Sequence, residues 1–165
     1  ARRARFSELF DAAHRRRMRV VLIGGPSELE KRMGEDIIAA CEAPLINQIG
    51  KDTLPLLLAL IARARVLLTP DSGPAHMATM VNTPVIGLYA ATNPARSGPY
   101  DSRQWCVDRY DAAALQFRRR PAAELPWTEK IEEPGVMDLI TVEAVVDRLD
   151  TLLQAPADAR PGAGR

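Results

Sequence analysis

The sequence predicts an α/β fold in which an open parallel sheet carries helices on both faces. Short stretches rich in valine, leucine and isoleucine alternate along the chain with longer stretches whose apolar residues recur at helical spacing. The short stretches contain few polar residues, as strands buried on both faces do. The links between them are brief, which fits strand–helix–strand units with parallel strands.

The first half of the chain alternates helices with strands. An amphipathic helix is expected over residues 4–17, followed by a strand in "RVVLIGG", residues 19–25. Ser27 and Glu30 have the spacing of a capping box, which predicts a helix that ends near Ala40. A second strand is expected in "APLINQIG", and a helix follows over residues 52–64 with a proline in its first turn.

The second half continues this alternation and then becomes less regular. Strands are expected in "RVLLTP" and "TPVIGLY", with a short helix from Pro74 to about Val81 between them. Residues 108–117 are interpreted as a helix. Residues 118–135 form an irregular, proline-containing segment. Residues 141–153 have the pattern of an amphipathic terminal helix capped by Thr141.

The composition limits the classes of protein to which this chain can belong. The 165 residues, 47% hydrophobic and 26% charged, suit one compact domain over residues 1–154, followed by a disordered tail over residues 155–165. The chain starts with alanine and lacks a signal peptide, so we expect one domain of a longer protein. Cys41 and Cys106 are isolated and only two histidines occur, so neither a disulfide framework nor a zinc site or multi-histidine metal centre is expected. No cofactor is expected either.

Charge and hydropathy limit the kinds of partner that the chain can bind. The net charge of +1 gives no general attraction to nucleic acid, and no apolar run approaches the roughly 20 residues that span a bilayer. Arginines nonetheless cluster in residues 2–19 and again at residues 118–120. Solvated helix faces are the simpler explanation. Attraction to phosphates or to an anionic membrane surface is the alternative, which leaves a peripheral membrane contact open.

Open parallel sheets bind ligands at the carboxyl ends of their strands. In "TPDSGPAH", Asp71 follows such a strand and is the one charged side chain between residues 66 and 95. The amides around Ser72 and Gly73 should begin a helix near Pro74, where a glycine allows a phosphate to approach. Asp71 or Ser72 could instead simply cap this helix, but the position at a strand end favours a ligand site.

His76 lies one helical turn beyond Ser72. A lone histidine on an apolar helix is more often a core side chain, so a role in bracing the loop is favoured over contact with a phosphate oxygen. Residues 91–100, "ATNPARSGPY", are long for a turn and are expected to close over a ligand. Arg96 is the one cation in this stretch and could balance phosphate charge.

Two other loops offer weaker candidates. "GGPSELE", which contains Gly25, lacks both G-x-G-x-x-G and G-x-x-x-x-G-K-[ST], so neither a dinucleotide dehydrogenase nor a P-loop nucleotidase is supported. Capping occupies Glu30, which leaves Glu28 to accept hydrogen bonds from a ribose, or only to complement the helix dipole. Lys51 and Asp52 precede the next helix, either as ligand contacts or as part of a plain cap.

Three stretches together, "VVLIGGPSELE", residues 46–100 and "VMDLITVEAVVDRLDTLL", resemble the carboxyl-terminal half of glycosyltransferase family 9, the heptosyltransferases of lipopolysaccharide core assembly. The resemblance covers residues 6–154 and is most specific in D-S-G-P-x-H and T-N-P-x-R-x-G-P-Y. It implies a Rossmann-like half of a two-domain GT-B fold. This half would bind a nucleotide sugar, typically ADP-heptose, opposite an amino-terminal acceptor domain.

The resemblance also implies roles for particular residues. Asp71 would contact the donor sugar, and the turn of Ser72 and Gly73 would hold the diphosphate through backbone amides, next to Pro74. Glu28 would hold the ribose, and the loop of Lys51 and Asp52 would lie against adenine.

Two further family positions lie in the helix and in the loop after the fourth predicted strand. His76 matches the family histidine. Thr92 and Pro94 match a T-D-P loop in which Asn93 replaces the usual aspartate, and this replacement puts any charge-dependent role of that position in doubt.

The implied reaction is inverting transfer, in which an acceptor hydroxyl attacks the anomeric carbon as the nucleoside diphosphate leaves. No general base is apparent among these residues. The resemblance places it in the amino-terminal domain, so we expect this chain alone to bind donor without catalysing transfer. The expected acceptor is a lipid-linked saccharide, and the expected location is the cytoplasm or the inner face of the inner membrane. The alternatives are half of a UDP-sugar epimerase of the same fold and a non-catalytic nucleotide-binding module.

Overall fold

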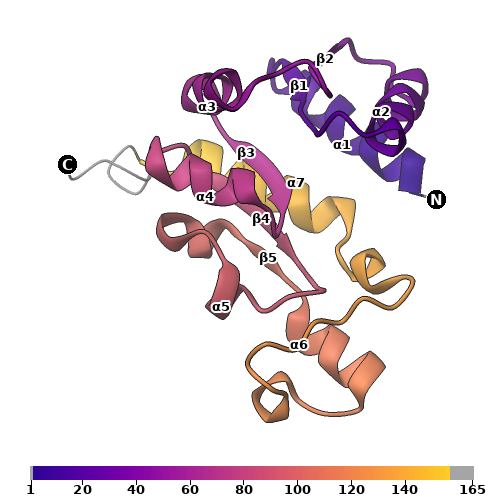
Figure 1. Ribbon diagram of the computed structural model, residues 1–165, viewed down its shortest axis with the longest axis vertical. Coiled ribbons are helices and arrows are strands. Elements are labelled where there is room, and N and C mark those ends of the chain that lie inside the picture. The colour runs from indigo at the N-terminus through magenta and orange to yellow at the C-terminus, as the bar shows by residue number, and fades with distance from the viewer. Residues whose placement is uncertain (1, 157–165) are drawn as a thin grey trace. The chain divides into compact units, whose positions relative to one another are not determined.

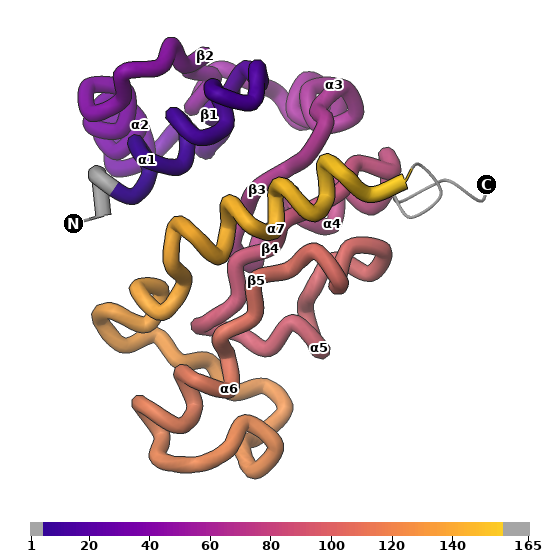
Figure 2. The backbone as a smooth tube through the Cα atoms, turned by 180° about the vertical axis from the view of Figure 1, so that it is seen from behind, coloured from indigo at the N-terminus to yellow at the C-terminus, as the bar shows by residue number. Residues whose placement is uncertain are grey.

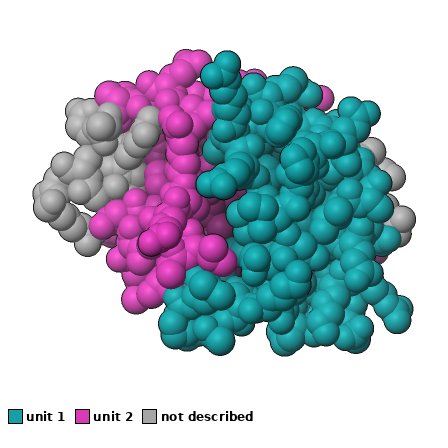
Figure 3. Space-filling model, turned by 90° about the horizontal axis from the view of Figure 1, so that it is seen from above, with its two compact units in different colours: residues 1–57 teal, residues 58–165 magenta. Residues whose placement is uncertain are grey.

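The computed structural model describes residues 2–156, with side chains from residue 5 onward. Most of the tail predicted for residues 155–165 therefore lies outside the described residues. The chain divides into two compact units, residues 1–57 (unit 1) and residues 58–165 (unit 2), coloured separately in Figure 3. The division falls inside helix α3 (Leu54–Arg63), and each unit is described by itself.

Unit 1 contains a two-stranded parallel ladder and two helices before α3. The helices are α1 (Arg2–Arg15) and α2 (Glu28–Ala40), and the strands are β1 (Val20–Leu22) and β2 (Leu45–Asn47). Val21 lies opposite Ile46 in the ladder. Helix α1 packs against α2 and β1 through a buried apolar face that includes Leu9 and Phe10. The Ser7 hydroxyl donates to the Ala40 carbonyl at 2.7 Å and joins the two helices.

Unit 2 contains a three-stranded parallel sheet in the order β3-β4-β5. The strands are β3 (Leu67–Pro70), β4 (Val85–Tyr89) and β5 (Val107–Asp108). Helix α4 (Gly73–Met80) lies on one face of this sheet and helix α7 (Val142–Gln154) on the other, as the two opposite views in Figures 1 and 2 show. Helices on both faces of a parallel sheet were predicted, and unit 2 confirms this prediction.

Short helices fill the links between these elements of unit 2. They are α5 (Pro94–Ser97), η1 (Tyr100–Trp105), α6 (Tyr110–Ala113), the π-helical η2 (Ala114–Arg118), η3 (Ala122–Glu124) and η4 (Val136–Leu139). Among residues 2–156, no helix is both long enough and apolar enough to cross a membrane.

Two elements differ from the prediction. Strand β5 was not expected, and residues 108–117 were interpreted as one helix. Asp108 instead pairs with Tyr89 of β4, and its carboxylate accepts a hydrogen bond of 2.9 Å from the Tyr110 N–H. The helix therefore begins only at Tyr110, because Asp108 is committed to the sheet. A sequence pattern does not reveal a strand of two residues that depends on a partner far along the chain.

The 118–135 segment, predicted to be irregular, is held by long-range contacts. Arg118 Nε donates to Glu129 at 2.6 Å, and Nη1 donates to the Glu133 carboxylate. The buried Ile131 donates its N–H to the Ala91 carbonyl at 2.8 Å, which ties the segment to the loop after β4. The segment thus has few regular elements but a defined path.

Candidate functional site

The turn between β3 and α4 carries Asp71, Ser72 and Gly73 at the carboxyl end of a parallel strand. Ser72 precedes α4 in an extended conformation but makes no capping hydrogen bond. Its hydroxyl lies 2.7 Å from the hydroxyl of Thr69 instead. The alternative in which Asp71 or Ser72 simply caps α4 is therefore not realised. Gly73 is exposed, and a Cβ added there would meet no atom within 4 Å, so the start of α4 is open to a ligand.

Asp71 is half-buried and has a defined hydrogen-bond donor. The Ser97 hydroxyl, at the end of α5, donates to Asp71 Oδ2 at 2.7 Å. The hydroxyl of the fully buried Tyr89 donates to the Ser97 carbonyl at 3.3 Å. Burial raises the pKa of Tyr89, and the nearby Asp71 charge raises it further, so this phenol stays protonated and continues to donate.

The loop after β4 is a short helix rather than an open turn. Asn93 precedes α5, and its Oδ1 accepts a hydrogen bond of 2.9 Å from the Ala95 N–H. Thr92 is buried at the base of this loop. Arg96 is half-buried, and its Nε is buried without a hydrogen-bond partner among the described residues. A second cation, Arg103, donates to the Ala95 carbonyl at 3.1 Å, which the sequence reasoning missed.

His76 is exposed on α4, and no side-chain hydrogen bond joins it to another residue within the described part of the chain. The favoured interpretation, in which His76 braces the loop as a core side chain, is therefore wrong. Its ring faces solvent because the buried positions of this helix are Ala75 and Ala78. The imidazole remains free to meet a ligand.

In unit 1, the loops after β1 and β2 lie together at the carboxyl ends of the two strands. The Gly50 N–H donates to the Gly24 carbonyl at 3.0 Å, and the Gln48 N–H donates to the Leu22 carbonyl at 2.9 Å. Gly50 has a φ of +69°, a left-handed conformation that favours glycine. The loop of residues 24–28 and the loop of residues 48–52 are thus joined by their backbones.

Glu30 completes a variant of the predicted capping box. Ser27 Oγ accepts from the Glu30 N–H at 3.2 Å, while the Glu30 carboxylate accepts from the Ser27 hydroxyl at 2.6 Å and from the Gly25 N–H at 3.0 Å. These hydrogen bonds, the one from Ser27 first, hold the pKa of Glu30 below its ordinary value. The N–H of Gly25, a predicted ligand group, is therefore already satisfied by Glu30.

The other three candidates of unit 1 are more accessible. Glu28 is exposed and accepts a hydrogen bond of 2.9 Å from Lys31 one helical turn away. Lys51 is exposed and donates to the Asn47 carbonyl at 2.9 Å. Asp52 is half-buried, and neither Asp52 nor Thr53 makes a side-chain hydrogen bond to the start of α3 within the described residues. The alternative of a plain side-chain cap by these residues is not realised.

The structure thus forms two groups of candidates. Asp71, Ser72, Gly73 and Pro74 meet the loop of residues 92–97 in unit 2, while Gly25, Glu28, Lys51 and Asp52 share one end of the ladder in unit 1. Residues 2–156 contain no group of three or more His, Cys, Asp or Glu side chains that could hold a metal ion. Ser97 was missed because its role depends on a contact 26 residues away, and no local pattern marks it.

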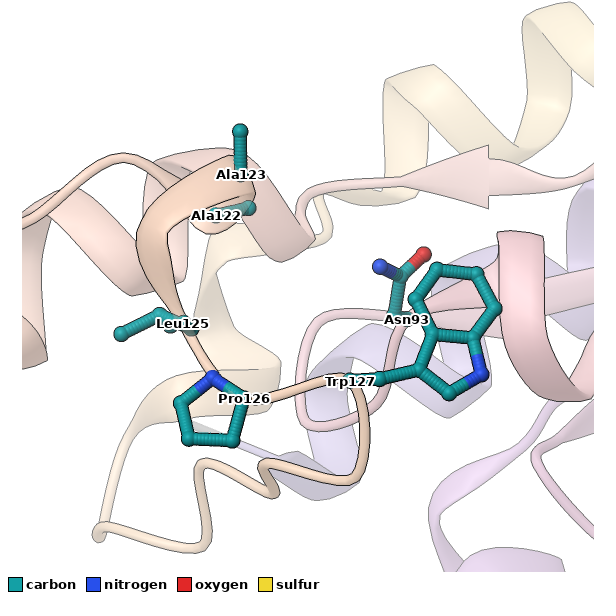
Figure 4. Close-up of a pocket in the computed structure, with 6 residues that line it drawn as sticks. All are labelled: Asn93, Ala122, Ala123, Leu125, Pro126 and Trp127. Atoms are coloured by element: carbon teal, nitrogen blue, oxygen red, sulfur yellow. The ribbon is translucent and has the colours of Figure 1, made fainter.

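A pocket of about 360 Å³ lies beside the loop after β4, lined by Asn93, Ala122, Ala123, Leu125, Pro126 and Trp127. Figure 4 shows the Asn93 amide and the Trp127 indole on one side, with Leu125 and Pro126 across from them. Trp127 is 61% exposed. The sequence reasoning named Asn93 but missed this pocket, because the 118–135 segment has no pattern that predicts where it folds back.

Comparisons with known proteins agree on one family. The family model of glycosyltransferase family 9 (heptosyltransferase) matches residues 2–127. The chain is 38% identical over 147 residues to the lipopolysaccharide core heptosyltransferase OpsX of Haemophilus influenzae, covering 89% of this chain and 42% of that protein. It is 42% identical over 152 residues to a lipopolysaccharide heptosyltransferase 3 of Escherichia coli. That match covers 91% of this chain and 42% of that protein. The chain thus spans about two-fifths of the length of these relatives.

Solved structures agree with the sequence relatives. A glycosyltransferase of family 9 from Veillonella parvula superposes with a TM-score of 0.70 at 25% identity, covering 92% of this chain and 41% of that one. The E. coli ADP-heptose lps heptosyltransferase II superposes with a TM-score of 0.63 at 22% identity and shares the fold. The match covers 90% of this chain and 41% of that one. The chain therefore belongs to glycosyltransferase family 9 and has the α/β fold of one half of a GT-B glycosyltransferase.

Proposed function

We propose that this chain binds the donor of an inverting heptosyltransferase, which transfers heptose from ADP-heptose to a lipopolysaccharide core acceptor. The observation that carries the proposal is the open start of α4, where no side chain caps the helix and Gly73 leaves room for a ligand. The relatives named as lipopolysaccharide heptosyltransferases support heptose as the sugar and the lipopolysaccharide core as the acceptor.

In this proposal the donor diphosphate binds at the N-terminus of α4. The amides of the Ser72–Gly73 turn point toward it, and the positive end of the eight-residue helix stabilises the charge that develops on the leaving nucleoside diphosphate. Pro74 fixes the helical φ of the first turn and has no N–H of its own. His76, exposed one turn further on, reaches a phosphate oxygen.

Asp71 contacts the donor sugar with a carboxylate held by Ser97. In the loop that carries Ser97, Thr92 is buried, Asn93 caps α5, and Arg96 supplies positive charge to balance the phosphates. The buried Arg96 Nε has no described partner, which supports a role toward an anion.

For unit 1 the proposal keeps the nucleoside contacts implied by the family. Glu28 accepts from the ribose hydroxyls, Gly25 lies beside it in the loop after β1, and Lys51 and Asp52 contact the adenine. The exposure of Glu28 and Lys51 supports this assignment.

The reaction needs a general base that deprotonates the acceptor hydroxyl. We propose that this base belongs to an amino-terminal acceptor domain outside this chain, and that the present chain binds donor without transferring it. The acceptor is a lipid-linked saccharide, so the protein works in the cytoplasm at the inner face of the inner membrane. No observation favours half of a UDP-sugar epimerase or a non-catalytic nucleotide-binding module.

Calorimetric titration of the chain with ADP, UDP and NAD tests this proposal. We expect ADP to bind best, and Gly73→Val to weaken ADP by at least about tenfold, because its side chain fills the space that the diphosphate needs. Met80→Val places the same β-branched side chain at the exposed far end of α4 and should leave ADP binding unchanged. Preference for UDP, or equal binding by Gly73→Val and wild type, would contradict the proposal.

A further inference from the structure

The pocket of Asn93 and Trp127 contains no charged lining residue. Five of its six lining residues are alanine, leucine, proline or tryptophan, and the sixth is an amide. Phosphate groups bind most strongly to cationic side chains, and none lines this pocket. A lining of apolar and aromatic side chains with one amide side chain instead suits a ligand that has an apolar face and a hydroxyl edge.

The polar group of the pocket is a hydrogen-bond donor. Asn93 Oδ1 is occupied by the Ala95 N–H in the cap of α5, at 2.9 Å. The Asn93 NH₂ group has no hydrogen-bond partner among the described residues, so its two N–H bonds are the ones left for a ligand. An aspartate at this position would keep the cap but offer no donor.

The walls of the pocket are held in place before any ligand arrives. Arg118 binds Glu129 and Glu133, and Ile131 donates to the Ala91 carbonyl, so the 118–135 segment is fixed against the loop that carries Asn93. Asp111 accepts a hydrogen bond of 3.0 Å from the Ala122 N–H, which fixes the start of η3. A pocket that is ordered in advance loses less entropy when it binds.

We propose that this pocket binds a sugar ring of the saccharide acceptor, with the ring's C–H face on the Trp127 indole and a hydroxyl accepting from Asn93. A large exposed indole gives apolar contact area to such a face, while the polar edge of the sugar stays hydrated or bonded. The assignment to the acceptor rests on the proposed function, which places the donor sugar at Asp71. Asp71, Ser72 and Gly73 are not among the lining residues.

Helix α5 links the pocket to that donor site. Asn93 begins α5, and Ser97, which ends it, donates to Asp71. A sugar bound at Asn93 would therefore lie beside the loop that positions the donor, as an acceptor must.

Tryptophan fluorescence tests this proposal. The chain has two tryptophans, and Trp105 is buried with no partner for its Nε1 among the described residues, so Trp105→Phe leaves Trp127 as the sole reporter. We expect a deacylated lipopolysaccharide inner-core oligosaccharide to reduce acrylamide quenching of Trp127 at least about twofold, without ADP present. In calorimetry, Trp127→Ala should weaken oligosaccharide binding at least about tenfold and leave ADP binding unchanged. Trp127→Phe should bind the oligosaccharide within about threefold of the parent affinity.

Two further variants complete the test. Asn93→Asp keeps the cap and removes the donors, so oligosaccharide binding should fall about fivefold. Leu115→Ala, which shortens an exposed side chain outside the pocket, should change nothing. The proposal is overturned if Trp127→Ala binds the oligosaccharide like the parent, or if ADP or ADP-heptose rather than the oligosaccharide protects Trp127. Absence of ADP binding alone would overturn the donor site and leave the pocket standing.

Discussion

The Ser97 hydroxyl donates to Asp71 Oδ2 at 2.7 Å and so joins the turn after β3 to the helix after β4. Ser97 is itself fixed, because its N–H donates to the Asn93 carbonyl at 3.1 Å and its carbonyl accepts from the buried Tyr89. A carboxylate in a stretch with no other charge is therefore oriented by a neutral hydroxyl. Its negative charge is not neutralised by this contact and stays available to a ligand.

Ser97→Ala should weaken the binding of ADP-heptose by about tenfold and change the affinity for ADP much less. A hydrogen bond to a charged group contributes roughly 1.5–3 kcal/mol, and Asp71 is proposed to contact the sugar rather than the nucleoside. Calorimetric titration with both ligands measures the difference. Ser97→Thr keeps the hydroxyl and should restore binding, whereas Ser7→Ala removes a hydroxyl contact in unit 1 and should leave both affinities unchanged. Equal losses for ADP and ADP-heptose would show that Ser97 does not act through the sugar contact.

Gly87→Ala should destabilise the protein by about 1–3 kcal/mol, because overpacking a filled core costs this much. Gly87 lies in β4, where an added Cβ would stand 2.5 Å from Tyr89 Cε2 and 2.9 Å from Cys106 Sγ. Gly73→Ala is the matched control, since its Cβ meets nothing within 4 Å. Urea unfolding of the two variants should separate them, with Gly73→Ala within about 0.5 kcal/mol of wild type. Similar midpoints for both variants would contradict this packing argument.

The sequence predicted the features that depend on local chemistry. Ser27 and Glu30 marked the start of α2, and Thr141 marked the start of α7 by accepting from the Ala144 N–H at 3.2 Å. The parallel strands also followed from their apolar composition. These signals succeed because a cap or a buried strand uses residues that lie next to one another in the sequence.

The features that failed depend on partners distant in the chain. His76 was assigned to the core because its helix is apolar, but the narrow buried face of α4 is supplied by two alanines and leaves the imidazole exposed. Strand β5 exists only because Val107 pairs with Leu88. The contacts of Ser97 with Asp71 and of Arg118 with Glu133 are similar cases. Hydrophobic periodicity carries no information about such contacts. The sequence therefore placed the site at the strand ends but did not identify all of its residues.

Glu30→Gln should lower stability at neutral pH and have a smaller effect in acid. The carboxylate accepts from Ser27 and Gly25, which lowers the pKa of Glu30 below its ordinary value of 4.5. A lowered pKa stabilises the folded state above the unfolded pKa, and this contribution disappears as pH falls through the folded pKa. Thermal unfolding at pH 7 should show a lower midpoint temperature for the variant than for wild type. This difference in midpoint should become smaller at pH 3. Glu28→Gln, on the exposed face of the same turn, controls for the loss of a charge, and a difference independent of pH would contradict the assignment.

Arg118→Lys should loosen the 118–135 segment although it keeps the charge. Arg118 uses three nitrogens for three acceptors, the Glu129 and Glu133 carboxylates and the Lys130 carbonyl, and a lysine ammonium cannot reproduce that planar fork. Hydrogen–deuterium exchange should therefore speed up about tenfold at the Ile131 N–H, which bonds to Ala91 across the segment.

The same contact should depend on pH. The Arg118 hydrogen bond lowers the pKa of Glu133, so the contact persists at neutral pH and is lost as pH falls through that lowered pKa. In acid, wild type and Arg118→Lys should then exchange alike once intrinsic rates are corrected. Arg119→Lys, at the neighbouring exposed position, should behave like wild type throughout. Unchanged protection of Ile131 in Arg118→Lys would mean that the backbone bond to Ala91, rather than the guanidinium, holds the Trp127 wall in place.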